Sequence, residues 1–301
     1  MLHAAKTPNL NTFHAHVTHR MKPKELPAHT GWEAELKLGF IRRVEGTVLA
    51  ERAHRGPLRV QKALYPEGEA VCQTLLLHPP AGIAGGDHLH IEAAVGEGAH
   101  AQLTTPGAGK WYRSGGPEAS QRLDFTVAGT LEWLPQETIV FDGAKARMQT
   151  HITLETDARF FGWEVLCLGR TASGERFNEG HISLDTRIER NGQPLWVERG
   201  LLHGDDPLLR SPVAFADATV SATLLATLPT DVQAAPLVAA CREIAPADNA
   251  RHGLTALPGL LVARYLGHHS EAARHWLTQL WTQLRPALLN REAVPPRIWN
   301  T

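Results

Sequence analysis

The feature that most limits the fold is a long series of short apolar runs, which begins at Trp32 and continues to Leu228. In many of them apolar and polar residues alternate, as in half-buried strands, and glycine, proline or charged pairs separate them. The runs are 34–40, 48–53, 58–63, 72–77, 123–127, 130–134, 138–141, 148–154, 159–168, 181–188, 195–202 and 218–228. We therefore predict a mainly β fold of many short strands, as a sandwich, a barrel or a β-helix-like stack. Periodicity does not choose among these.

The C-terminal quarter has a different pattern. The alanine-rich segment Asp231–Ile244 follows Thr230, a suitable N-cap, although Pro236 is expected to disturb its first turns. After it, 254–266 has the pattern of a strand with an interruption at Pro258-Gly259.

A second helix is predicted to start behind Ser270 as its cap and to end at Arg285-Pro286. One face of this helix is apolar and carries Ala273, Leu277, Trp281 and Leu284, flanked by Trp276 and Leu280. We expect a β body at about 31–228 and an α/β part at about 229–301. No linker between them is rich enough in flexible residues to force a second domain.

Residues 1–30 contain five histidines among polar residues and prolines, with little apolar side chain to bury. We predict a disordered tail. Its alternative is a histidine tract that gathers metal, and Met21 is an alternative start of the chain.

Composition excludes few classes of protein. The 301 residues, 43% of them hydrophobic, are enough to bury a sizeable core, and a net charge of −1 gives no electrostatic argument for nucleic acid or an anionic membrane. No apolar run approaches the roughly 20 residues of a membrane-spanning helix. Cys72, Cys167 and Cys241 are odd in number and widely spaced, which suggests neither disulfides nor a thiolate zinc site. We expect a cytoplasmic protein.

Two enzyme signatures are nearly present, and each fails. GAGK at 107–110 lacks both the earlier glycine and the Ser or Thr of a Walker loop. GEGAHA at 96–101 precedes a strand-like, proline-broken segment instead of the helix that would hold a pyrophosphate. G-x-S-x-G and H-E-x-x-H do not occur.

His88, His90 and Glu92 occupy alternate positions of one predicted strand and so project from one face. Two imidazoles and a carboxylate can bind a divalent ion, which makes a metal-dependent hydrolase or lyase the alternative function. However, side chains at i and i+2 stand about 7 Å apart, and the face is more simply explained as the solvated side of an amphipathic strand.

Three acids stand in unusual surroundings. Asp87 follows Gly85-Gly86, where its carboxylate either serves a site or caps backbone amides of the turn. Glu164 is enclosed by an apolar run that is expected to bury it, and an ionised buried carboxylate is costly unless it is paired or metal-bound. Glu198 precedes Arg199, so an ordinary Glu-Arg ion pair is its simpler explanation.

Several segments together resemble the urease accessory protein family UreD (UreH). The two most specific are HPPAGIAGGD and TTPGAGKWYRS within 78–114. In family order, the others are RGPLRVQKALYPEG, LEWLPQETIVFDGA, FGWEVLCLGR and the terminal PPRIWNT. The resemblance covers most of 31–301, as one UreD-like domain, and favours the β-helix-like fold.

This resemblance implies a function that the residues alone do not reach. The chain is expected to be a non-enzymatic metallochaperone subunit that binds UreF, through it the GTPase UreG, and apo-urease, for nickel incorporation. It implies an acidic internal passage for transient Ni²⁺ with no tightly bound cofactor. By motif, Asp87, Glu164 and Glu198 correspond to its acids. Glu67, Glu69, His88 and His90 are weaker candidates. Carboxylates in a passage lower the barrier for a cation without holding it. Partner contacts or support of the turn are expected from Lys110, Trp111, Tyr112 and Arg113.

Overall fold

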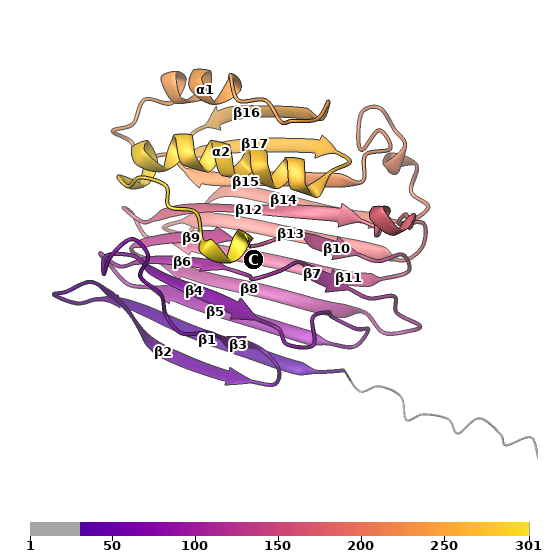
Figure 1. Cartoon of the computed structure of the whole chain (residues 1–301), viewed down its shortest axis with the longest axis horizontal. Helices are drawn as coiled ribbons and strands as arrows, with labels where there is room; N and C mark the ends of the chain where they lie inside the picture. Colours follow the sequence, from indigo (N-terminus) through magenta and orange to yellow (C-terminus); the bar gives the residue numbers. More distant parts are fainter. Residues whose placement is uncertain (1–30, 301) are drawn as a thin grey trace, which may run out of the picture.

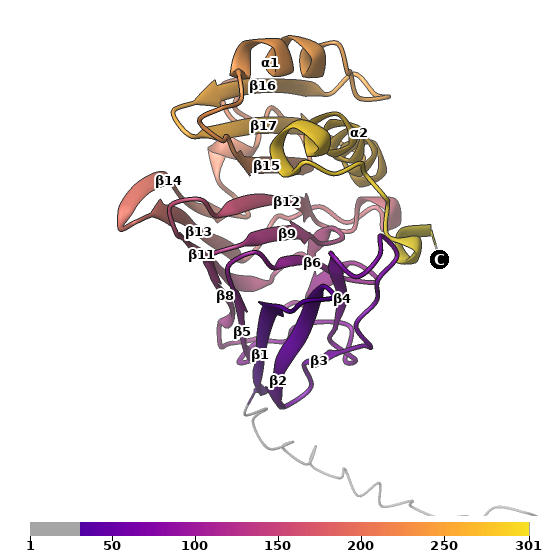
Figure 2. The same cartoon turned by 90° about the vertical axis from the view of Figure 1, so that its left-hand side faces the viewer.

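Two β-sheets face each other in the computed structural model, which describes residues 31–300 (Figure 1, Figure 2). The seven-stranded sheet has the order β14 (Gln193–His203), β13 (His181–Arg190), β11 (Lys145–Leu154), β8 (Ala119–Val127), β5 (His88–Val95), β1 (Glu33–Arg42) and β2 (Thr47–Arg55). The ten-stranded sheet has the order β16 (Arg251–Leu257), β17 (Leu260–Gly267), β15 (Val220–Thr227), β12 (Arg159–Leu168), β9 (Thr130–Leu134), β6 (His100–Thr104), β4 (Cys72–Leu77) and β3 (Arg59–Val60). Two short strands complete it, β10 (Thr138–Val140) beside β12 and β7 (Gly109–Trp111) beside β10. The prediction of a mainly β fold is confirmed.

The chain winds between the sheets from β4 to β13, and successive turns stack in parallel. In one sheet β5, β8, β11 and β13 are parallel neighbours, and in the other β4, β6, β9 and β12 are. Antiparallel pairs extend this stack: β1 with β2, β13 with β14, and β15, β17 and β16 in turn. The fold is thus a sandwich whose middle winds like a β-helix. Its sheets keep free edges, so it is not a closed barrel.

Alternation within each strand places the core between the sheets. In β5, Leu89, Ile91, Ala93 and Val95 are buried, whereas His88 is exposed and His90 is half-buried. The same period of two in β8 and β12 contributes further side chains to one core cluster. Burial of alternate apolar side chains from both sheets is the main stabilising contribution to such a sandwich.

The helix α2 (Ser270–Leu289) covers the outer face of the ten-stranded sheet, and α1 (Ala234–Arg242) packs beside its edge strand β16 (Figure 2). The predicted apolar face of α2 is buried against this sheet in a second core cluster, which includes Trp276 and Trp281. Three short 3₁₀ helices lie at Thr171–Ser173, Pro207–Leu209 and Arg297–Asn300.

The predicted helix starts were wrong by one to three residues. The helix α1 begins at Ala234, so Thr230 is not its cap and Pro236 lies in its first turn. A start at 231 would have placed the ring of Pro236 against the carbonyl of Val232, four residues earlier, in a helix interior. For α2 the N-cap is His269, not Ser270, because the amide of Ala273 donates to the His269 carbonyl.

The predicted end of α2 was also wrong, because the helix continues through Pro286 to Leu289. An interior proline removes one backbone hydrogen bond and commonly ends a helix. Here Arg285, Leu288 and Leu289 are buried on the sheet, and this burial favours the extra turn. Asn290, with φ of 56°, ends the helix in the left-handed conformation.

Two sequence predictions concern residues or boundaries that this structure does not test. The predicted disordered tail, residues 1–30, lies outside the described residues. The domain bounds remain predictions. Within 31–300 no helix is long and apolar enough to cross a membrane, and the three cysteines are buried and free.

Candidate functional site

A cavity of about 590 Å³ lies between the two sheets. Its lining extends from His78 at the end of β4 to Arg264 on β17, five strand spacings away in the ten-stranded sheet. At about 4.8 Å per strand, this is a span of about 24 Å across the strands. The apolar core supplies most of the wall. Threonines from both sheets, together with Glu164 and Glu198, supply a polar stretch.

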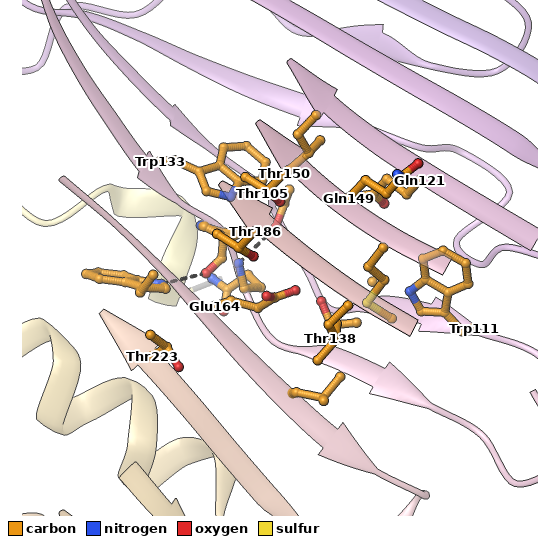
Figure 3. A pocket seen from close by; sticks show the side chains of 18 of the residues that line it. Thr105, Trp111, Gln121, Trp133, Thr138, Gln149, Thr150, Glu164, Thr186 and Thr223 are labelled. Carbon is orange, nitrogen blue, oxygen red and sulfur yellow. Dashed lines mark hydrogen bonds between the residues drawn. The ribbon is translucent and has the colours of Figure 1, made fainter. Parts of the chain in front are cut away.

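Glu164 points into this cavity from β12. The next residue, Val165, is buried on the other side of the sheet, beneath α2, so the alternation of the strand turns Glu164 toward the space between the sheets. Figure 3 shows it among Thr138, Thr186 and Thr223. This position is consistent with the prediction that the apolar run places Glu164 in the interior of the protein.

The Glu164 carboxylate has an unusual electrostatic environment. Burial raises its pKa to about 7, and the charge of nearby Glu198 adds to the effect. Within residues 31–300 no hydrogen bond or ion pair to this carboxylate occurs. The side chain nevertheless keeps intermediate accessibility, because it faces the cavity. It can therefore exchange a proton with water or bind a cation.

Glu198 reaches the same cavity from the opposite sheet. It lies on the edge strand β14, where it is paired with Thr186 of β13. Its carboxylate Oε1 is 2.8 Å from Nη2 of Arg264, on β17 of the other sheet. The expected Glu-Arg pair exists, but with Arg264, because Arg199 extends to the outer face and lies 3.4 Å from Asp185.

Asp87 is buried but serves the turn. Gly86, with φ of +93°, adopts a conformation that favours glycine and directs the following carboxylate back onto the chain. The Asp87 oxygens accept hydrogen bonds of 2.8 Å from the backbone amides of Trp32 and Ala84. Asp87 is 3% exposed and is not among the described residues that line the cavity. The turn-capping alternative accounts for its position, and its role in a nickel passage stays a prediction.

A second acidic centre, which sequence reasoning missed, lies on the opposite face of the same sheet. Glu132 on β9 is fully buried under α2. Its Oε1 is 2.7 Å from His100 Nε2, and its Oε2 accepts a 2.7 Å hydrogen bond from Trp281 Nε1. Arg285 donates to both oxygens, through Nη2 at 2.9 Å and Nε at 3.0 Å.

This network reverses the effect of burial. Desolvation alone raises the pKa of Glu132, but His100 and Arg285 outweigh it and hold that pKa at about 2. Arg285 also donates to both oxygens of Glu67 at 2.8 Å. The sequence carried a signal for Glu132, since it stands between Leu131 and Trp133 as Glu164 stands between apolar neighbours. Nothing in the sequence paired it with a residue 153 positions away.

The weaker acidic candidates do not reach the cavity. Both oxygens of Glu67 are engaged by Arg285, and Glu69 is exposed. Neither is among the described residues that line the cavity. Their assignment to a nickel passage stays a prediction that this geometry does not support.

His88, His90 and Glu92 project from the outer face of β5, as predicted. His90 Nδ1 lies 3.5 Å from Glu92 Oε1, and His90 Nε2 lies 2.7 Å from Asp124 Oδ2. His88 does not join them, because its Nδ1 lies 2.7 Å from Ser120 Oγ. Within residues 31–300 no group of three or more His, Cys, Asp or Glu side chains is arranged to hold a metal ion. This strand face therefore gives no support to a metal-dependent hydrolase or lyase.

The Lys110–Arg113 segment divides between the cavity and the surface. Lys110 and Trp111 line the cavity, and Trp111 is only 2% exposed, so partner contact through Trp111 stays a prediction that this burial does not support. Tyr112 packs edge-on against Phe141, with ring centroids 5.1 Å apart. Arg113 is exposed and binds Asp142 and Glu179. Partner contacts by Lys110, Tyr112 and Arg113 stay predictions.

Known proteins resemble the chain over nearly its whole length. A family model described as UreD urease accessory protein matches residues 33–300. A protein named Urease accessory protein UreD from Dechloromonas aromatica (strain RCB) is 64% identical over 283 residues, which cover 93% of this chain and 98% of that protein. Proteins of the same name from Azoarcus sp. (strain BH72) and Pseudomonas fluorescens (strain Pf0-1) are 52% and 54% identical, over 91% and 90% of this chain and 96% and 95% of theirs.

Proposed function

The chain belongs to the UreD family of urease accessory proteins, and on this premise we propose that it helps to incorporate nickel into apo-urease. In this proposal it is a non-enzymatic cytoplasmic subunit that holds no cofactor tightly. It binds UreF, through UreF the GTPase UreG, and apo-urease, and Ni²⁺ is its transient cargo. The cavity between the sheets forms part of the route of the ion.

One observation carries the passage proposal: two carboxylates from facing sheets, Glu164 and Glu198, line one cavity, and Glu164 lacks a cationic partner within residues 31–300. A buried carboxylate is normally paired or hydrogen-bonded, because leaving it without partners is costly. An acid that faces a cavity without such partners is available to a passing cation.

The raised pKa of Glu164, about 7, suits transport better than storage. A carboxylate must lose its proton before it binds a metal, so Ni²⁺ competes with a proton at neutral pH and is bound less tightly. Among the described residues of this stretch, Glu164 and Glu198 are the anionic ligands, and Glu198 is paired with Arg264, so there are too few free charged ligands for a permanent site. Ions that enter a passage must bind well enough to enter and weakly enough to leave.

The experiment that tests the passage compares Glu164→Gln and Glu198→Gln with the control Glu51→Gln. Glu51 is an exposed carboxylate on β2, paired with Lys37 at 3.3 Å and remote from the cavity. Purified chain, UreF, UreG, GTP and Ni²⁺ are mixed with apo-urease, and the rate of urease activation is measured. We expect each cavity variant to slow activation by about tenfold, as loss of one favourable charge interaction of about 1.4 kcal/mol would, and the control to leave it unchanged.

Partner binding has to be measured on the same variants. All three should still co-purify with tagged UreF, because the substitutions leave the outer surface of the two sheets intact apart from Glu51 itself. Normal activation by both cavity variants would eliminate the passage. Failure of the folded wild-type chain to co-purify with UreF would eliminate the proposed complex.

A further inference from the structure

Arg264 connects the two sheets at the side of the cavity formed by β14 and β17. It lies on β17, and its Nη2 is 2.8 Å from Glu198 Oε1 on the edge strand β14. Its Nη1 donates a 3.1 Å hydrogen bond to Thr223 Oγ1, and its guanidinium carbon lies 5.5 Å from the ring centroid of Trp196. Arg264, Thr223 and Glu198 all line the cavity.

Two of these contacts, with Thr223 and Trp196, can hold the guanidinium without Glu198. If Arg264 releases Glu198, the hydroxyl of Thr223 and the face of Trp196 still hold it. The Arg264 and Glu198 side chains are 45% and 35% exposed, and ion pairs with this degree of exposure are weak. The pair can therefore open without disturbing the core.

We propose that Arg264 is a displaceable counter-ion that makes the cavity selective for divalent cations. This inference rests on the proposed nickel passage and names the residue that sets its specificity. In the resting protein the guanidinium occupies Glu198. A divalent cation displaces it, whereas a monovalent cation does not.

Charge is the physical basis of this selectivity. The energy of attraction to a carboxylate scales with the charge of the cation, so Ni²⁺ gains twice what K⁺ gains at the same distance. Glu164 faces the same cavity and adds to the attraction for an ion near Glu198. A monovalent ion offers Glu198 no more charge than the guanidinium does. It also lacks the guanidinium's two contacts, through Nη2 to Glu198 and through Nη1 to Thr223. Guanidinium stays charged at all physiological pH values, so Arg264 itself does not titrate. The attraction that Glu164 adds weakens as the pH falls through about 7.

The test removes the charge of Arg264 and reads the cavity directly. The full-length chain carries ¹³C-methyl threonine, and Ni²⁺ broadens the methyl signals of threonines near it. Thr186 and Thr223 report from the cavity, and the exposed Thr126 on β8 reports from the outer surface. This readout avoids the seventeen histidines, which would dominate a measurement of total nickel binding. Each titration is repeated in K⁺ and in tetramethylammonium chloride at equal ionic strength.

We expect K⁺ to have no effect on the wild-type titration. In Arg264→Gln the midpoint for Ni²⁺ at Thr186 and Thr223 should fall by about tenfold in tetramethylammonium, and K⁺ should now raise it. Arg264→Lys keeps the charge and should retain resistance to K⁺. The matched control is Arg170→Gln, because Arg170 also pairs with a glutamate, Glu175 at 2.6 Å, and lies 4.3 Å over the ring of Phe141, away from the cavity.

The outcomes separate the two proposals. Unchanged midpoints and unchanged resistance to K⁺ in folded Arg264→Gln would overturn the role of Arg264, even if Glu164→Gln still slowed urease activation. Absence of broadening at Thr186 and Thr223 in the wild-type chain would overturn both proposals. If Arg264→Gln does not fold, sensitivity of the wild type or of Arg264→Lys to K⁺ would still contradict the inference.

Discussion

Two glutamates on neighbouring strands of one sheet, Glu132 and Glu164, have opposite surroundings. Glu132 on β9 faces α2 and accepts hydrogen bonds from Trp281 and Arg285, with His100 also within bonding distance. Glu164 on β12 faces the cavity between the sheets and has no such partner among the described residues. The pKa is about 2 for the first and about 7 for the second.

Burial alone therefore does not determine what an acid does in this fold. Desolvation is the largest influence on both carboxylates, and the difference arises from the cations beside Glu132 and the anion beside Glu164. A carboxylate with a complete set of partners joins a helix to a sheet. A carboxylate that lacks them and faces a cavity is free to meet a cation that comes from outside.

The largest effect is expected for Glu132→Gln. The change leaves Arg285, which is fully buried, with Glu67 as its remaining anionic partner, and breaking a buried ion pair costs about 3 kcal/mol or more of unfolding free energy. Urea unfolding at pH 7 measures this loss. The exposed Glu51→Gln should change stability by less than about 1 kcal/mol. A similarly small loss for Glu132→Gln would mean that the network under α2 is not structural.

Glu164→Gln should increase the unfolding free energy, by an amount that depends on pH. The folded state holds the Glu164 proton up to about pH 7, whereas the unfolded chain releases it near the ordinary value of 4.5, so this group destabilises the fold increasingly as pH rises between these values. Glutamine removes that penalty. The gain in unfolding free energy of Glu164→Gln over wild type should be near zero at pH 4.5 and rise to as much as about 3 kcal/mol at pH 8.

Urea unfolding of Glu164→Gln and wild type at several values between pH 4.5 and 8 gives this difference directly. Glu132 contributes in the other direction and in another range, because its stabilisation is present above about pH 4.5 and is lost as the pH falls through 2. If the difference in unfolding free energy between Glu164→Gln and wild type does not change with pH, Glu164 titrates normally.

The sequence predicted the class of fold because strand periodicity is local. Alternation in β5 and burial on one face of α2 depend on residues a few positions apart, and both are confirmed. The boundaries at Thr230 and Pro286 were missed because competing long-range burial decides where those helices begin and end. The winding between sheets depends on pairings such as Glu92 with Asp124, which no local pattern reveals.

The candidate site was predictable only in part for the same reason. An acid within an apolar run pointed to Glu164, and the same rule would have found Glu132. Two features distinguish these acids. Glu132 is paired with Arg285, far along the chain, and the two side chains lie on opposite faces of the sheet, Glu132 beneath α2 and Glu164 in the cavity. Likewise, the sequence suggested an ion pair between Glu198 and Arg199, but the partner of Glu198 is Arg264 across the cavity.

The smallest effect is expected for the double change His88→Ala with His90→Ala. Both side chains lie on the outer face of β5, where they bond to Ser120 and Asp124 and take no part in the cavity. Urease activation should stay within about twofold of wild type, since exposed polar contacts contribute little. A loss beyond tenfold in a soluble, UreF-bound variant would move the nickel route to the outer face of the sheet.

The contrast between the two glutamates is most directly tested by ¹³C NMR of their side-chain carboxyl groups, followed from pH 4 to 9 in one sample and assigned with Glu132→Gln and Glu164→Gln. We predict that the Glu164 signal titrates with a midpoint of about 7, while the Glu132 signal stays at the position of an ionised carboxylate throughout. A Glu164 midpoint near 4.5 would contradict the account, because it would show that solvent or an unrecognised cation already satisfies this carboxylate.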